Sequence, residues 1–417
     1  MPTSWSALIH ADFFNAAELL AAWNELDANR HEAAQAEFWH ALSSRELPLR
    51  HSTTHHLTFL YRDVAARHVH LTLNRITDKH FTDRGLLTQL PGSDIWVATF
   101  DLGAAYVSSY GFQTYEVPPQ PRQSPVGHEI YPWVRDPYNP NTLIHADNTH
   151  GLSVVAGPYS GCIAALSAFD ARTGYTPTVH EFSHHIGDED IKITLASVST
   201  HPEILLICPD GEKWHDRLDF AATLAAYQAQ HPDFPSAAVA TLHNADGPAR
   251  MRLLQGDSAL RATADQLFPA ITEVFERYFG SQPYKTVFAG QSLGGLSALL
   301  LYLHYDPALS LDLIIAQSPS LWWRPGGGRP HHSGLQSTWL ARQCAALENT
   351  STTQSSLDHP ELALHVGLRE DMLLEQTLRL HTQMRYQGLP VHIETFDGGH
   401  DMAWWMAGII HELATFV

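Results

Sequence analysis

The spacing of hydrophobic positions changes along the chain. Residues 7–26 are rich in Ala, Leu and Glu and predict a helix. From His56 to about Tyr115, short runs of alternating apolar and polar residues predict β-strands. Turn residues such as Pro91-Gly-Ser-Asp94 separate these runs, which lie at 57–61, 69–73, 95–100 and 107–112. Strands of this length and spacing are typical of a small all-β sandwich.

Residues 117–160 have a different composition. The stretch is rich in Pro, Gly, Asn and Asp, with a proline run at 117–125 and the sequence Arg135-Asp-Pro-Tyr-Asn-Pro140. Such residues favour turns and irregular backbone. We therefore expect a long, ordered connection that lies over the surface of two domains.

After this connection the pattern alternates between strands and helices. Predicted strands lie at 191–198, 204–208, 286–289, 313–316, 362–366 and 391–396, and predicted helices at 258–278, 296–305 and 372–387. Short, fully apolar strands with helices between them indicate a mainly parallel sheet covered on both faces. We therefore expect an N-terminal β-sandwich domain at 1–150, including its helix and connection, and an α/β domain at 151–417.

Composition and charge exclude several classes of protein. Of the 417 residues, 44% are hydrophobic and 17% charged, as in ordinary folded proteins. The net charge of −19 disfavours nucleic acid and anionic membranes as partners. No apolar run reaches the roughly 18 residues of a membrane helix, and residues 1–5 do not resemble a secretory signal. The three separated cysteines Cys162, Cys208 and Cys344 fit reduced thiols, so we expect a cytoplasmic protein.

The strongest chemical motif is Gly290-Gln-Ser-Leu-Gly294, which lies between a predicted strand and a predicted helix. A sharp strand-to-helix turn exposes a serine in a strained conformation, and glycines let the neighbouring backbone pass closely. Ser292 is therefore the candidate nucleophile. The N–H of Leu293 opens the helix, where it can stabilise a developing oxyanion.

The base and the acid are expected later in the chain. His400 follows the last predicted strand in Asp397-Gly-Gly-His-Asp401, and the strand at 362–366 leads into Glu370 and Asp371. The order Ser, acid, His is that of α/β-hydrolases. Glu370 is the preferred acid and Asp371 the alternative. A second oxyanion donor is expected at the N–H of Glu212, after the strand at 204–208.

A second motif, His180-Glu-Phe-Ser-His184, matches the H-E-x-x-H pattern of zinc proteases. Those enzymes need both histidines on one face of a helix. Here the sequence around the motif leaves room for barely two helical turns, and residues 179–184 alternate as an edge strand. We therefore expect no metal, and nothing in the sequence indicates a cofactor.

Taken together, these motifs resemble the enterobactin (enterochelin) esterases, a group of α/β-hydrolases. The resemblance covers most of the chain from about residue 55. Its matching pieces are Gly92-Ser-Asp-Ile-Trp96, Ser109-Tyr-Gly-Phe112, Arg135-Asp-Pro-Tyr-Asn-Pro140, Asp210-Gly-Glu-Lys-Trp214, Arg250, Ala289–Ala298, Gln317-Ser-Pro-Ser-Leu-Trp-Trp323, Gly367-Leu-Arg-Glu370 and Asp397–Asp401. It implies an immunoglobulin-like N-terminal domain and an α/β-hydrolase catalytic domain.

The resemblance also implies a substrate, a catecholate siderophore built on a cyclic triester of serine and carrying ferric iron. In such a site Arg250 matches the family's pocket arginine. Lys213 and Arg324 would add cationic donors, and Trp322 and Trp323 would stack on catechol rings. The stretch after Arg250 lacks the glutamate and asparagine that the family places near this arginine.

Two alternatives stay open at this point. The same triad would serve a general carboxylesterase that acts on feruloyl or acetyl esters. A protein that only binds ligands could also keep the hydrolase fold, although such a binder has no need for Ser292, Glu370 and His400 together. The oligomeric state does not follow from the sequence.

Overall fold

The computed structural model describes residues 4–118, 133–144, 151–186, 189–255, 259–326, 338–347 and 359–416. The chain divides into two compact units. Residues 1–163 with 397–404 form the first, and residues 164–396 with 405–417 form the second. Within the described ranges, no helix is long and apolar enough to cross a membrane.

The first unit contains two four-stranded antiparallel sheets. Their strand orders are β1-β2-β5-β4 and β3-β6-β8-β7. The strands are β1 Leu49–Arg50, β2 Leu57–Arg62, β3 His68–Leu73, β4 Thr88–Gln89, β5 Ile95–Phe100, β6 Val107–Tyr115, β7 Thr142–Ile144 and β8 Gly151–Ala156. Buried residues from both sheets, such as Phe59, Leu71 and Phe112, share one core. The predicted all-β sandwich is confirmed.

Three helices precede the sandwich, where the sequence predicted one. They are α1 Trp5–Ile9, α2 Ala16–Asn24 and α3 His31–Leu42. The helical pattern over 7–26 is divided between α1 and α2 because Asn15 starts a new helix. Its side chain accepts the Glu18 N–H, and the Glu18 side chain accepts the Asn15 N–H. The helices bury aromatic residues, among them Trp23 and Phe38, against the first sheet.

The connection predicted over 117–160 contains two strands, β7 and β8. β8 pairs with β6, and β7 pairs with β8. The rest of this connection includes 119–132 and 145–150, which lie outside the described residues. β7 has three residues and β8 has six, and both lie within a stretch rich in Pro, Gly, Asn and Asp, so the sequence pattern did not reveal them.

Buried polar groups fix the Arg135–Pro140 segment to the sandwich. The Tyr110 hydroxyl donates to Asp136 Oδ2 at 2.8 Å, and the Asp136 N–H donates to Ser153 Oγ at 2.8 Å. The Asn139 amide donates to the Tyr110 hydroxyl and to the Val154 carbonyl. Burial raises the pKa of Asp136 to about 6. These hydrogen bonds, which we call the lock at Asp136, therefore hold the segment against the second sheet.

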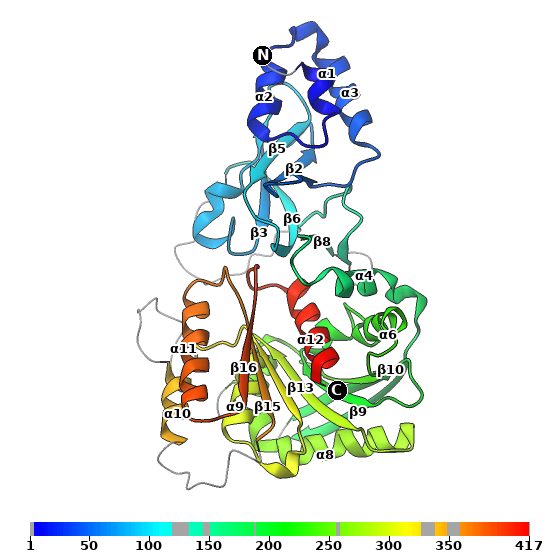
Figure 1. The fold of residues 1–417 in the computed structure, drawn as a ribbon, viewed down its shortest axis with the longest axis vertical. Helices are drawn as coiled ribbons and strands as arrows, with labels where there is room; N and C mark the ends of the chain where they lie inside the picture. Colours follow the sequence, from blue (N-terminus) through cyan, green and yellow to red (C-terminus); the bar gives the residue numbers. More distant parts are fainter. Residues whose placement is uncertain are drawn as a thin grey trace. The chain divides into compact units, whose positions relative to one another are not determined.

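The second unit is built on an eight-stranded sheet of order β16-β15-β14-β13-β11-β12-β10-β9 (Figure 1). All neighbouring strands from β12 through β11 to β16 are parallel, and β10 and β9 are antiparallel to their neighbours. Their bounds are β9 Thr178–Ile186, β10 Glu189–Ser197, β11 Ile204–Pro209, β12 Ala237–Leu242, β13 Lys285–Gln291, β14 Leu313–Gln317, β15 Glu361–Gly367 and β16 Val391–Phe396. The predicted α/β domain is confirmed, and β12 was missed.

Helices lie on both faces of this sheet (Figure 1). They are α4 Ile163–Ala171, α5 Gly211–Trp214, α6 Phe220–Gln230, α7 Gly247–Leu254, α8 Ala259–Phe279, α9 Leu293–Leu303, α10 Trp339–Leu347, α11 Met372–Tyr386 and α12 Met402–Phe416. Helices α8 to α11 share a hydrophobic core with one face, which includes Phe288, Ile314 and Leu364. α12 contacts the other face, where the Gln317 side chain bonds the Trp405 carbonyl and the His365 side chain bonds the Glu412 carboxylate. The carboxyl ends of the parallel strands are therefore held between two packed layers.

The lock at Asp136 gives a first prediction. Asp136→Ala leaves the buried Tyr110 hydroxyl without its acceptor, so we expect the free energy of unfolding of the first unit to fall by about 1–3 kcal/mol. Calorimetry would measure this loss. Glu116→Ala, which removes a carboxylate with an 81% exposed side chain, is the matched control and should change the free energy by less than about 0.5 kcal/mol. Equal effects of the two substitutions would contradict the lock.

Candidate active site

Ser292 lies at the sharp turn between β13 and α9. Its backbone has φ 59° and ψ −111°, a strained region for a residue with a side chain. The Ser292 N–H donates to the Gln317 carbonyl at 3.0 Å, and the Ser292 carbonyl accepts the Ser320 N–H at 2.9 Å. Backbone bonds to the loop after β14 therefore hold the turn in this conformation.

Two glycines make the turn sterically feasible. A Cβ atom at Gly290 would lie 2.1 Å from the Gly294 carbonyl oxygen, and one at Gly294 would lie 2.9 Å from Pro209 Cγ at the end of β11. The Leu293 N–H opens α9, in the first turn where helix N–H groups have no partner within the helix. This local geometry matches that expected of a nucleophile elbow. The role of the Leu293 N–H as an oxyanion donor stays a prediction.

The structure separates the two acid candidates. Glu370 is 1% exposed, and its Oε2 atom accepts the Ser318 hydroxyl at 2.6 Å and the Gly367 N–H at 2.9 Å. Asp371 is exposed and begins α11 with φ 49°. Ser318 directly follows β14, the strand beside β13. Glu370 is therefore fixed at the carboxyl edge of the sheet, and its role as the triad acid stays a prediction.

His400 lies in the loop 397–401, between β16 and α12. Its backbone N–H donates to Asn74 Oδ1 at 2.8 Å. The neighbouring Asp401 carboxylate is buried and accepts the Ser109 hydroxyl at 2.6 Å. Asn74 and Ser109 both belong to the first unit, and neither was predicted from the sequence as a support for the histidine loop.

The predicted oxyanion turn after β11 contains a charged cluster. Asp210 is 2% exposed and adopts a left-handed conformation with φ 62° at the start of α5. The Arg250 guanidinium donates to both carboxylate oxygens of Asp210, at 2.5 and 2.6 Å, and Lys213 Nζ lies 3.2 Å away. Burial raises the pKa of Asp210, but these two cations outweigh it and hold the pKa below its usual range.

Two further polar side chains complete this turn. The Asn244 amide donates to Asp210 Oδ1 at 2.9 Å and to the Glu212 carboxylate at 3.1 Å. The N–H groups of Lys213 and Trp214 donate to the Asp210 carbonyl. The Glu212 N–H lies in the first turn of the short helix, so its role as an oxyanion donor stays a prediction.

The predicted aromatic contacts differ in exposure. Trp322 is 39% exposed, whereas Trp323 is 9% exposed and packs edge-on against Trp339 at 5.1 Å between ring centroids. Arg324 is exposed. Trp323 thus belongs to the core around α9, and Trp322 offers the more accessible ring for stacking.

The H-E-x-x-H motif lies in β9, the edge strand of the sheet, as predicted. Its two histidines are four residues apart in an extended strand, which separates them by about 13 Å. The His180 ring stacks on Tyr278 with centroids 3.4 Å apart. This geometry is unlike that of a zinc protease.

Another group of side chains has the spacing of a metal site. One ligand atom each from His365, Glu394 and Glu412 lies within 4.8 Å of the others. However, His365 Nδ1 lies 3.0 Å from the Gln317 amide nitrogen, and its Nε2 lies 2.8 Å from Glu412 Oε1. With the amide N–H donating to Nδ1, the proton of the neutral ring would lie on Nε2, toward Glu412, where it leaves no lone pair for a metal. The predicted absence of a metal stays a prediction.

The Asp210 cluster generates a second prediction. Arg250→Ala leaves a buried carboxylate without its bidentate partner, so we expect the free energy of unfolding to fall by about 3–5 kcal/mol. Asp210→Ala combined with Arg250→Ala should lose less than the sum of the single substitutions. Urea unfolding measures all three variants. Arg277→Ala, which breaks an exposed pair with Glu273, is the control and should cost less than about 1 kcal/mol. Additive losses would contradict the coupling.

Searches of curated proteins found relatives that match nearly the whole chain. An iron(III) salmochelin esterase from Escherichia coli O6:H1 is 29% identical, over 93% of this chain and 94% of the relative. An iron(III) enterobactin esterase from Dickeya dadantii is 28% identical, over 91% of this chain and 92% of the relative.

Solved structures show the same fold. The enterobactin esterase from Shigella flexneri, crystallised in the presence of enterobactin, is 21% identical with a TM-score of 0.68, over 91% of this chain and 97% of that chain. The ferric enterobactin esterase from Salmonella typhimurium is 20% identical with a TM-score of 0.66, over 88% of this chain and 94% of that chain. Both confirm the predicted α/β-hydrolase domain with an N-terminal β-sandwich.

Two family patterns match in sequence. Residues 56–160 match the family described as "Enterochelin esterase, N-terminal", and residues 205–416 match the one described as "Putative esterase". The second match covers half of the chain and includes Ser292, Glu370 and His400. The chain belongs to this esterase family, and its sandwich carries the N-terminal pattern of the enterochelin esterases.

Proposed function

We propose that this protein is a serine esterase that hydrolyses the ester bonds of a catecholate siderophore of the enterobactin class, in its ferric form, and so releases iron. One observation carries the proposal: the strained turn at Ser292 and the buried Glu370 follow β13 and β15, the two strands that flank β14. Relatives named as iron(III) salmochelin and enterobactin esterases match more than nine-tenths of the chain, which supports this substrate class.

In the proposed reaction the Ser292 hydroxyl attacks an ester carbonyl while His400 removes its proton. The N–H groups of Leu293 and Glu212 stabilise the negative oxygen of the tetrahedral intermediate. His400 then gives the proton to the leaving alkoxide, and an ester between Ser292 and the acyl group remains. Water, activated by His400, cleaves this ester and frees the serine. Glu370 orients the histidine throughout.

Charged and aromatic side chains would recognise the substrate. Arg250 and Lys213 supply N–H donors for catecholate oxygens, and the exposed ring of Trp322 can stack on a catechol. The exposed Arg324 adds a further cation. The ferric complex is anionic and the protein has a net charge of −19, so we expect the complex to bind at these cationic donors rather than elsewhere on the protein. Its three cysteines are buried thiols with no disulfide between them, which suits the reducing cytoplasm, our proposed location.

The central test compares substrates. Purified protein should hydrolyse ferric or iron-free enterobactin, and chromatography would detect the linear products. Ser292→Ala should lower kcat by about 10⁴-fold or more, because no other group can form the acyl-enzyme.

The matched control for this test is Ser281→Ala, which replaces an exposed serine before β13 and should leave the rate unchanged. A simple p-nitrophenyl ester is assayed in parallel. Turnover of this ester alone would replace the siderophore with a general carboxylesterase substrate. Full activity of Ser292→Ala would exclude the mechanism.

The two acid candidates give a separate prediction. Glu370→Gln keeps the size of the side chain but removes the charge that stabilises the histidine cation, so kcat should fall by about 10²–10⁴-fold. Asp371→Asn changes an exposed neighbour and should stay within about twofold of the parent enzyme. Steady-state kinetics on the same ester measures both. A larger loss for Asp371→Asn would move the acid to that residue.

A further inference from the structure

A row of buried polar side chains crosses the sheet directly beneath the nucleophile. Gln291, Gln317 and His365 are paired in register on β13, β14 and β15. Their exposed fractions are 3%, 0% and 0%. Gln291 directly precedes Ser292, and the side chains of Gln317 and His365 project toward α12. Buried amides and imidazoles are costly without partners, so each member of this row must be satisfied.

The direction of the hydrogen bonds in the row follows from one unambiguous donor. The Trp214 indole N–H can only donate, and it lies 2.8 Å from Gln291 Oε1. The amide nitrogen of Gln291 therefore faces Gln317 and donates to its Oε1 atom at 3.0 Å. Neither amide can rotate by half a turn without setting two donors or two acceptors against each other.

The same direction continues through the histidine. The Gln317 amide nitrogen donates to the Trp405 carbonyl at 2.9 Å and to His365 Nδ1 at 3.0 Å. This arrangement places the His365 proton on Nε2, which donates to Glu412 Oε1 at 2.8 Å. Burial raises the pKa of Glu412, but hydrogen bonds from His365 and His392 outweigh it and hold the pKa at about 2. Glu412 is thus an ionised acceptor, as this direction requires.

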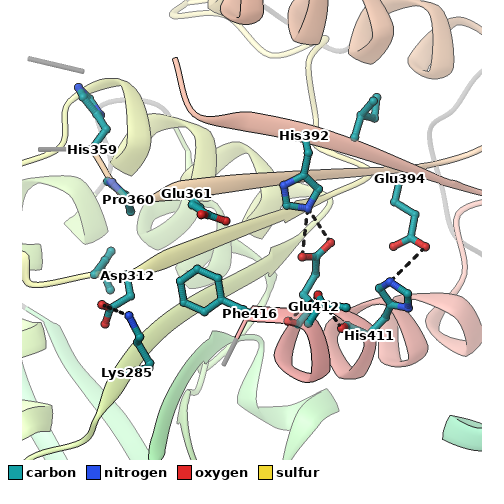
Figure 2. Close-up of a pocket in the computed structure, with 13 residues that line it drawn as sticks. Lys285, Asp312, His359, Pro360, Glu361, His392, Glu394, His411, Glu412 and Phe416 are labelled. Atoms are coloured by element: carbon teal, nitrogen blue, oxygen red, sulfur yellow. Dashed lines mark hydrogen bonds and ion pairs between the residues drawn. The ribbon is translucent and has the colours of Figure 1, made fainter. Parts of the chain in front are cut away.

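The row ends at an open pocket of about 770 Å³. Figure 2 shows the Glu412 carboxylate on α12 facing His392 on β16, with Nε2–oxygen distances of 2.9 and 3.1 Å. Glu394 and His411 lie in the same pocket, 3.9 Å apart, and Lys285 pairs with Asp312 on another side of it. Glu412 is therefore held from both sides, by a buried histidine and by a half-exposed one.

Backbone bonds join the row to three parts of the candidate active site. The Gln317 carbonyl accepts the Ser292 N–H, and the His365 carbonyl accepts the Ser318 N–H. Ser318 in turn donates from its hydroxyl to Glu370. At the other end, Trp214 closes α5, the helix that begins at the Asp210 turn. A shift of the row would move the nucleophile, the acid and the oxyanion turn together.

We propose that Gln317 and His365 are positioning residues for ester hydrolysis, and that the fixed direction of this row sets the geometry of the Ser292 and Glu370 turns. The proposal rests on the proposed function. Its physical basis is that only one arrangement satisfies all the buried groups, from the Trp214 indole to the Glu412 carboxylate. A misplacement of about 1 Å in a catalytic group can cost about a hundredfold in rate.

The first test compares two substitutions at one position. His365→Leu removes both ring nitrogens, so Gln317 and Glu412 each lose one hydrogen-bond partner. We expect kcat to fall about tenfold to a hundredfold while KM changes less than about twofold. His365→Gln offers an acceptor and a donor on one side chain and should restore most of kcat. Thr223→Val removes the hydroxyl of a residue that is 0% exposed, and this hydroxyl donates to the Asp219 carbonyl; the variant controls for stability loss alone. Thermal unfolding is measured for each.

Two readouts keep the test independent of the substrate. The rate at which a fluorophosphonate labels Ser292 should fall in His365→Leu and recover in His365→Gln, even if the wild-type protein hydrolyses neither enterobactin nor a p-nitrophenyl ester. That last outcome would refute the proposed function and the role in ester hydrolysis, whereas the labelling rates would still test whether the row sets the geometry of Ser292. Nitrogen NMR of the histidine rings, assigned by the signal missing in His365→Gln, should show His365 protonated on Nε2. A proton on Nδ1, or a folded His365→Leu with wild-type kcat and labelling rate, overturns the proposal.

Discussion

The sharp turn at Ser292 is the constraint on which the rest of the catalytic unit depends. A side chain held at φ 59° costs about 1–3 kcal/mol, and the turn leaves no space for a Cβ at Gly290. Burial of all of α9, from Leu293 to Leu303, offsets this cost. The turn cannot relax without separating this helix from β13 and β14. The strained backbone of Ser292 and the packing of α9 on the sheet therefore depend on each other.

The polar row beneath the turn continues this logic. Apolar strands are readily buried, but a catalytic site at their carboxyl ends requires polar groups within the core. Each buried polar group without a hydrogen-bond partner would cost about 1–3 kcal/mol. The side-chain amides of Gln291 and Gln317 each donate and accept a hydrogen bond, and the Glu412 carboxylate accepts the last hydrogen bond of the row, from His365. The support of Glu370 by Ser318, and of Ser318 by the Trp405 indole, follows the same pattern. These buried hydrogen bonds serve to fix one geometry of the strand ends rather than to stabilise the fold.

The sequence predicted those elements that the local pattern of apolar residues and short motifs determines. Apolar runs located most strands of the sheet, and the motif around Ser292 located the turn. The strand β12, Ala237–Leu242, was not predicted because alanine, which makes up half of it, has a low strand propensity. Glu370 and Asp371 could not be separated because neighbouring residues face different ways, a choice that only tertiary packing makes. The Asp210–Arg250 pair, the row ending at Glu412, and the bond from Asn74 to the His400 loop join distant residues and leave no local signal.

The charge around Arg250 refines how the proposed substrate would be recognised. Arg250 and Lys213 lie against Asp210, and Glu212 shares Asn244 with the same carboxylate, so two cations and two anions occupy this turn. Their local sum is close to zero, in a protein whose net charge is strongly negative. A field of positive charge therefore cannot be the main attraction for an anionic siderophore. Fixed N–H donors, held in direction by the buried Asp210, and the exposed Trp322 ring would select the substrate by shape and hydrogen bonding.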